Sequence, residues 1–262
     1  MKFKILYIFI LIGLIGSGCS SYESVYQSIP LTIDGSSSDW GTTLDTKKNK
    51  DISYGVSNDS ENLYLRLHII DQAVQMKILA AGLTVWIDTT AKSKKELGIS
   101  CPLQKAPPKM DKNSMESMQS KPMSSRNQLL EAEFIGFEEA DQVYFISNNP
   151  FGVEISMDQD EFKAMYYELK IPFSSINLNT DNIISIGLET GSIDLPGSEN
   201  MQTGMRPSGS MGGKPGGMGG GRPGGMGGKP SGMNSQRSNM ETMDNIKTPT
   251  KFWIKNIQLV NN

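Results

Sequence analysis

Apolar and polar residues alternate with a period of two along much of the chain, which is typical of strands that bury one face. The clearest case is the segment 63–69, where leucine and isoleucine occupy every second position. In the segment 83–88, Val85 and Ile87 alternate with Trp86 and Asp88 in the same way. The pattern predicts strands over residues 31–35, 52–56, 63–69, 83–88, 132–137, 142–146, 152–157, 162–173, 183–188 and 252–259.

One segment departs from this alternation and predicts a short helix over residues 72–81, which Gly82 ends. The polar residues 58–62 form a tight connection between two alternating runs and predict a hairpin. This series of strands with little helix predicts an all-β fold, an antiparallel β-sandwich of the immunoglobulin-like or jelly-roll-like kind.

Two segments lack any periodicity and predict long low-complexity insertions within the sandwich. Residues 89–128 are rich in Lys, Ser, Met and Pro, and residues 191–245 hold more than half of the 27 glycines and half of the 16 methionines. The segment 191–245 buries too little apolar surface to offset its ordering entropy, so we expect it to be disordered. Because a strand pattern resumes at Phe252, this segment is an excursion inside the domain.

Four short motifs occur in an order that resembles carbohydrate-binding module family 9 and the related DOMON-like domains. The opening has Ile33-Asp34-Gly35 followed by Asp39-Trp40, and the hairpin has Asp59-Ser60-Glu61-Asn62-Leu63-Tyr64-Leu65. A strand ending in Asp88 and the late segment Glu168-Leu169-Lys170-Ile171-Pro172-Phe173 complete the set. The resemblance implies a β-sandwich that binds sugars in some members of the family and haem in others.

The N-terminus has the organisation of an export signal. Lys2 and Lys4 precede an apolar run over residues 5–15, which is about half of the ~20 residues that a membrane-spanning helix needs. The segment Gly16-Ser17-Gly18-Cys19 resembles a bacterial lipobox of the loose kind found in Bacteroidota-type sequences. We therefore expect residues 1–18 to be a lipoprotein signal peptide and Cys19 to carry the lipid, palmitate included, that anchors the protein in a membrane.

These boundaries predict the organisation of the mature protein. Residues 19–30 are expected to be a tether and residues 31–262 a single sandwich domain. No Asp follows Cys19 directly, which favours an outer-membrane lipoprotein and leaves the periplasmic or the surface-facing leaflet open. With 25 Lys and Arg against 28 Asp and Glu, the net charge of −3 gives no reason to expect nucleic acid as a partner. Cys101, the second of two cysteines, is expected to be a small, partly buried apolar residue.

The candidate ligand-binding residues are aromatic and polar side chains on the solvent faces of two predicted strands. If the strands 63–69 and 83–88 share a sheet, Tyr64, Arg66, His68 and Trp86 form one patch suited to stacking on a sugar and to bonding its hydroxyls. Trp40 is expected to close one end of the sandwich, and Trp253 is expected to be part of the core.

Metal ions and haem are further candidate ligands. The turn residues Asp34, Asp39, Asp59 and Glu61 offer oxygen ligands of the kind that Ca²⁺ prefers, although turn aspartates also cap backbone N–H groups. The methionine-rich insertions suggest Cu(I), and His68 with a methionine suggests haem as a further alternative.

No nucleophile motif or metal triad points to catalysis. We expect a non-catalytic binding module with a glycan ligand. The alternative is a structural or assembly lipoprotein that engages protein partners in the cell envelope.

Overall fold

The computed structural model describes residues 21–36, 38–41, 45–46, 52–103, 130–138, 141–179, 181–193 and 245–261. The predicted signal peptide 1–18 and the predicted lipidation site Cys19 lie outside the described residues. So do most of the predicted insertions 89–128 and 191–245, including their methionine-rich parts.

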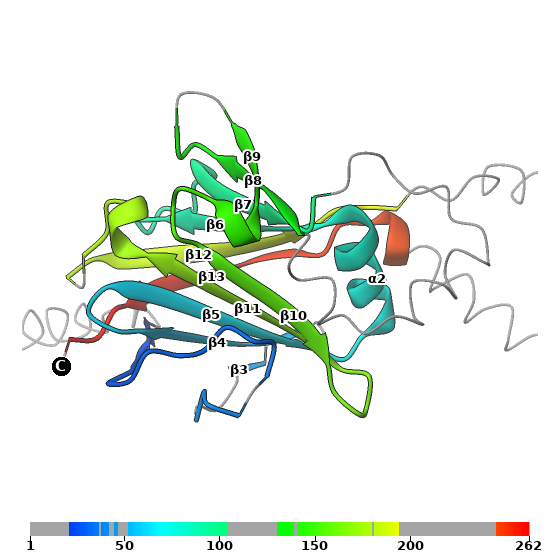
Figure 1. The fold of residues 1–262 in the computed structure, drawn as a ribbon, viewed down its shortest axis with the longest axis horizontal. Coiled ribbons are helices and arrows are strands. Elements are labelled where there is room, and N and C mark those ends of the chain that lie inside the picture. The colour runs from blue at the N-terminus through cyan, green and yellow to red at the C-terminus, as the bar shows by residue number, and fades with distance from the viewer. Residues whose placement is uncertain are drawn as a thin grey trace, which may run out of the picture.

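The described strands form two sheets that pack face to face (Figure 1). The seven-stranded sheet has the order β1 (Tyr22–Glu23), β13 (Lys251–Gln258), β12 (Ile183–Thr190), β6 (Leu83–Asp88), β7 (Leu97–Cys101), β8 (Glu131–Ile135), β9 (Gln142–Phe145). The six-stranded sheet has the order β10 (Glu154–Gln159), β11 (Met165–Pro172), β5 (Asn62–Ile69), β4 (Ile52–Asn58), β2 (Val25–Tyr26), with β3 (Asp45–Thr46) paired to β4. All pairings are antiparallel except β1 with β13 and β2 with β4.

The core lies between the two sheets and is filled by every second residue of the long strands. In β5 the inward residues are Leu63, Leu65, Leu67 and Ile69, each 1% exposed or less. The inward residues of β6, β11 and β12 complete the same cluster. The predicted all-β sandwich is therefore confirmed, and the period-two alternation is its cause.

Helix α2 (Gln72–Ala81) has the bounds that the sequence predicts and lies at one end of the sandwich (Figure 1). Asp71 caps its first turn by accepting a hydrogen bond from Val74 N, and Gly82 ends it with a φ of +83°. Because α2 follows β5 and precedes β6, it carries the chain from the six-stranded sheet to the seven-stranded sheet.

Lys77 of α2 is 3% exposed and bonds to the segment that leads into β13. Its Nζ donates to Asn245 O (3.0 Å), Thr248 O (3.0 Å) and Thr250 Oγ1 (2.7 Å). Ile193 N donates to Ile246 O, so the chain leaves β12 and re-enters before β13 at neighbouring points. The closing strand predicted after the Gly/Met-rich segment thus belongs to the seven-stranded sheet.

Three of the predictions differ from the structure. Residues 31–35, predicted as a strand, form none. Residues 97–101, assigned to the insertion 89–128, form strand β7, because Ile99 and Cys101 alternate into the core while Gly98 and Ser100 face outward. Residues 22–26, assigned to the tether 19–30, pair with β13 and β4. Strands β1, β2 and β7 are too short for their alternation to stand out from a polar surrounding.

No helix among the described residues is both long enough and apolar enough to cross a membrane.

Candidate functional site

The sequence-predicted patch of four residues does not form, because its members lie on different sheets. Tyr64, Arg66 and His68 are on β5 of the six-stranded sheet, whereas Trp86 is on β6 of the seven-stranded sheet. Helix α2 lies between β5 and β6 in the chain, and it carries the chain from one sheet to the other. The outward residues of β5 and β6 therefore face opposite sides of the sandwich.

Two of the β5 residues are also inaccessible, because the segment 31–40 covers them. Tyr64 is fully buried, its ring packs edge-on against Trp40 at 6.4 Å, and its hydroxyl donates to Asp59 Oδ2 at 2.5 Å. Arg66 is 4% exposed, and its guanidinium lies 5.1 Å from the centroid of the Trp40 ring. Trp40 is thus the buried plug that the sequence predicts, but it closes the outer face of the six-stranded sheet.

Glu168 of β11 holds the covering segment 31–40 against the outer face of the six-stranded sheet. It faces Arg66 across the strands β11 and β5, and its Oε2 accepts hydrogen bonds from Gly35 N at 2.8 Å and Asp34 N at 3.2 Å. Burial raises the pKa of the Glu168 carboxyl to about 7, although the bond from Gly35 works in the other direction. The motif Ile33-Asp34-Gly35 therefore attaches the covering segment 31–40 to the six-stranded sheet.

His68 is the one β5 residue of the predicted patch that is partly accessible. Its ring stacks on Tyr166 of β11 with centroids 4.7 Å apart and an angle of 21° between the planes. Burial lowers the pKa of the imidazole. The neighbouring Arg66 also acts to lower it, whereas Asp160 acts to raise it.

The four acidic residues considered for a metal do not come together. Asp59 accepts from the backbone N–H groups of Glu61 and Asn62 and so stabilises its own hairpin. Asp39 accepts from Thr32 N, and Asp34 accepts from Ser36 N. Among the described residues no three His, Cys, Asp or Glu side chains are placed to hold a metal ion together. These aspartates cap turns.

On the outer face of the seven-stranded sheet, one row of residues alternates glycine and tryptophan across four strands. Gly98 of β7 pairs with Trp86 of β6, Trp86 with Gly187 of β12, and Gly187 with Trp253 of β13. A Cβ on Gly187 would lie 2.9 Å from two atoms of the Trp253 indole, and one on Gly98 would lie 2.7 Å from the Trp86 indole. Each indole therefore lies against a neighbouring strand where only glycine leaves room for it.

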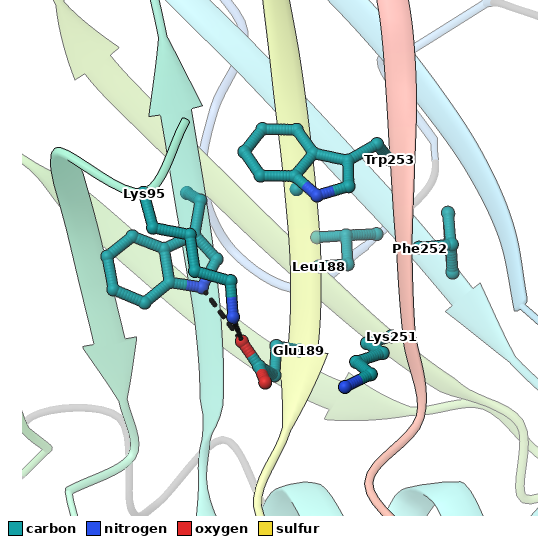
Figure 2. A pocket seen from close by; sticks show the side chains of 8 residues that line it. Lys95, Leu188, Glu189, Lys251, Phe252 and Trp253 are labelled. Carbon is teal, nitrogen blue, oxygen red and sulfur yellow. Dashed lines mark hydrogen bonds and ion pairs between the residues drawn. The ribbon is translucent and has the colours of Figure 1, made fainter. Parts of the chain in front are cut away.

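A pocket of about 340 Å³ lies between these two indoles (Figure 2). Its polar side chains are Lys95, Glu189 and Lys251, and Figure 2 shows Lys95 pointing toward Glu189. Glu189 accepts a hydrogen bond from Trp86 Nε1 at 3.2 Å and forms an ion pair with Lys95. The remaining lining comes from β12 and β13, namely from Gly187, Leu188, Phe252 and Trp253.

The two indoles of this pocket differ in what covers them. The Lys95 ammonium lies 5.4 Å from the centroid of the Trp86 ring, in a cation–π contact. Trp253 is half-buried, with one side against Gly187. Burial raises the pKa of the Glu189 carboxyl, but the hydrogen bonds from Lys95 and Trp86 outweigh it and leave the pKa below its ordinary value.

Trp253 is the site residue that the sequence-based interpretation placed wrongly, in the core. The inward residues of β13 at this point are Phe252, which packs on the core, and Ile254, which is 2% exposed. Trp253 shares the outer face with Lys251 and Lys255, which are both exposed. The alternation of Lys251 and Lys255 with Phe252 and Ile254 is the signal that assigns Trp253 to the solvent side.

Comparison with known proteins finds similar structures but no similar sequence. No family model and no curated protein matches the sequence. Among solved structures, the chain is similar to a family 9 carbohydrate-binding module from Caldicellulosiruptor kristjanssonii in complex with glucose, with 9% identity and a TM-score of 0.35. It is also similar to such a module in complex with cellotriose, with 9% identity and a TM-score of 0.36. The matches cover 67% of this chain and 80% and 78% of the two modules, which come from the family that the sequence motifs resemble.

Proposed function

We propose that this chain is a non-catalytic module that binds a saccharide on the outer face of the seven-stranded sheet. The observation that carries the proposal is the placement of Trp253. Its indole is held against Gly187 beside a pocket with charged groups at its edge. An aromatic face next to polar groups suits a sugar ring, because C–H groups pack on the ring and hydroxyls bond to the polar side chains.

The polar edge of the pocket supplies both kinds of hydrogen-bonding partner. Lys95 and Lys251 are donors, and the Glu189 carboxylate is an acceptor already oriented by Trp86 Nε1. Trp86 forms the opposite wall, fixed by Glu189 on its nitrogen and by Lys95 over its ring. A site whose side chains are held in place before binding loses less entropy when the ligand arrives.

The same residues support binding without catalysis. Glycoside hydrolysis commonly needs two carboxyl groups, one of them with a raised pKa so that it can donate a proton. Of the described residues that line the pocket, Glu189 alone carries a carboxyl group, and its pKa is lowered. It is therefore an ionised acceptor under neutral conditions.

The test is a titration calorimetry panel of neutral and charged oligosaccharides against the wild-type protein and Trp253→Ala. We expect saturable binding to at least one glycan and its loss in Trp253→Ala. Phe162→Ala is the matched control, because Phe162 is 82% exposed on the hairpin that joins β10 to β11 of the other sheet. Absence of binding to every glycan, with both proteins folded, contradicts the proposal.

We also propose that the domain is exported and anchored in the outer membrane through a lipid on Cys19. The charged, apolar and lipobox-like segments of residues 1–19 support this. Since Tyr22 already pairs with Ile257 of β13, only residues 20 and 21 separate the anchor from the sheet, a reach of about 10 Å. Metabolic labelling with palmitate is the test, with incorporation expected in the wild-type protein and none in Cys19→Ala.

A further inference from the structure

We propose that the pocket between Trp86 and Trp253 selects an anionic saccharide, one that carries carboxylate or sulfate groups. This inference rests on the proposed saccharide binding and names the chemical class of the ligand. It follows from the distribution of charge around the two indoles.

The first observation is the arrangement of lysines along β13. Lys251, Trp253 and Lys255 lie on the outer face, and each lysine is two residues from the tryptophan, which is about 7 Å along a strand. Both lysines are exposed. A sugar ring stacked on Trp253 therefore has an ammonium group within reach on either side along the strand.

The second observation concerns the one carboxylate that lines the pocket. Glu189 faces Lys251 across β12 and β13, but it forms its ion pair with Lys95 and accepts a hydrogen bond from Trp86. Lys251 also acts on this carboxylate electrostatically and helps to lower its pKa. Two lysines thus share one carboxylate in the lining, which leaves one positive charge in excess, and Lys255 adds a second on the same strand.

The third observation is that the nearby acidic residues of β6 and its following turn are engaged elsewhere. Asp88 is 3% exposed and accepts hydrogen bonds from Thr90 N and Lys94 N, which closes the turn after β6. Glu96 pairs with Lys94 at 3.0 Å. The charged side chains that line the pocket, Lys95, Lys251 and Glu189, therefore sum to a positive charge, although the whole chain carries a net charge of −3.

This charge distribution has a physical consequence for selectivity. A carboxylate or sulfate at the edge of a stacked sugar gains an ion pair with an exposed ammonium, whereas a neutral sugar gains one ordinary hydrogen bond. Each exposed pair contributes modestly and is screened by salt. Two such contacts shift the preference by about tenfold toward the charged ligand.

The experiment compares glycans that differ only in charge. The probes are a hexagalacturonate and its fully methyl-esterified form, with a sulfated carrageenan hexasaccharide and its desulfated form in parallel. We expect about tenfold tighter binding of at least one anionic probe than of its neutral counterpart, and a loss of that preference in Lys251→Gln/Lys255→Gln. Whichever pair shows the preference identifies the anionic group.

One control variant and three outcomes complete the test. Lys163→Gln/Lys170→Gln removes the same charge from the other sheet and its hairpin, and should leave the preference unchanged. Neutral and charged probes that bind equally well, both dependent on Trp253, overturn this inference while the proposed function stands. Anion binding that persists in Trp253→Ala is non-specific attraction and overturns it as well. Failure of all four probes also overturns this inference, and the proposed function fails with it only when every glycan of the wider panel is unbound as well.

Discussion

The indole of Trp253 lies against Gly187, its cross-strand partner, so closely that a Cβ on Gly187 would come within 2.9 Å of Cε2 and Cζ2 of the ring. The same relationship links Trp86 to Gly98. A glycine beside each tryptophan lets a large ring lie along the sheet instead of projecting into solvent. The orientation of both indoles is therefore built into residues that contact no ligand themselves.

Substitution of Gly187 tests this orientation. In Gly187→Val the new side chain displaces the Trp253 indole, so we expect saccharide affinity to fall at least about tenfold and stability to fall by about 1–3 kcal/mol. Calorimetric titration gives the first value, and urea unfolding followed by circular dichroism gives the second. Ile183→Ala is the control at the start of the same strand, where the side chain is 47% exposed. Unchanged binding in Gly187→Val contradicts the role of the glycine.

The raised pKa of Glu168 predicts a specific pH dependence of stability. The folded-state pKa of about 7 exceeds the ordinary value of 4.5, so the folded protein binds more protons than the unfolded chain between these values. The contribution of Glu168 is therefore fully present below about pH 4.5 and is lost as the pH rises toward 7. The loss amounts to at most about 3 kcal/mol.

Glu168→Gln isolates this effect, because an amide oxygen still accepts the bond from Gly35 N and does not titrate. We expect the free energy of unfolding of the variant, relative to the wild-type protein, to rise between pH 4.5 and 7 and to stay level above that. Urea unfolding at a series of pH values measures it. A constant difference across this range shows that Glu168 titrates normally in the folded state.

The hydrogen bonds of Lys77 predict that the segment between β12 and β13 is dispensable for folding. Its two ends are joined by the bond from Ile193 N to Ile246 O and by Lys77 on the 245–250 side. We expect a chain in which a short glycine–serine linker replaces residues 195–243 to have a free energy of unfolding within about 2 kcal/mol of that of the full chain, since loop closure depends only weakly on length. Equilibrium unfolding of both chains provides the comparison.

Loss of the lysine itself should have the opposite outcome. Lys77→Met leaves one buried acceptor, Thr250 Oγ1, and two partly buried carbonyl oxygens without their donor, and lowers the free energy of unfolding by about 1–3 kcal/mol. Lys163→Met, at an exposed position in the hairpin between β10 and β11, serves as the control. If Lys77→Met is as stable as the wild-type protein, the attachment of the returning segment rests on its apolar contacts alone.

Cys101 is fully buried, and burial raises the pKa of its thiol well above the ordinary value. In a Cys19→Ser background, where Cys101 is the remaining cysteine, we expect negligible reaction with a thiol reagent in the folded state and rapid reaction in urea, because the thiolate is the reactive form. Rapid labelling of the folded protein at neutral pH would disagree with the buried position.

Much of the fold follows from local pattern, because alternation and helix capping act within a few residues. The alternation in β5 and β6 and the cap residues Asp71 and Gly82 suffice to predict both strands and the helix between them. Strand β7 is missed because Gly98 and Ser100 dilute the apolar signal of Ile99 and Cys101 beside a lysine-rich stretch.

The sequence by itself determined which residues of each strand point inward, since the side-chain direction in a strand depends only on parity. Only the tertiary structure decided which outward faces stay accessible. Tyr64 and Trp86 have the same parity relative to their inward neighbours, yet Tyr64 is covered by Trp40 and Trp86 lines a pocket. Strand partners and covering segments come from residues far along the chain, so no local pattern specifies them.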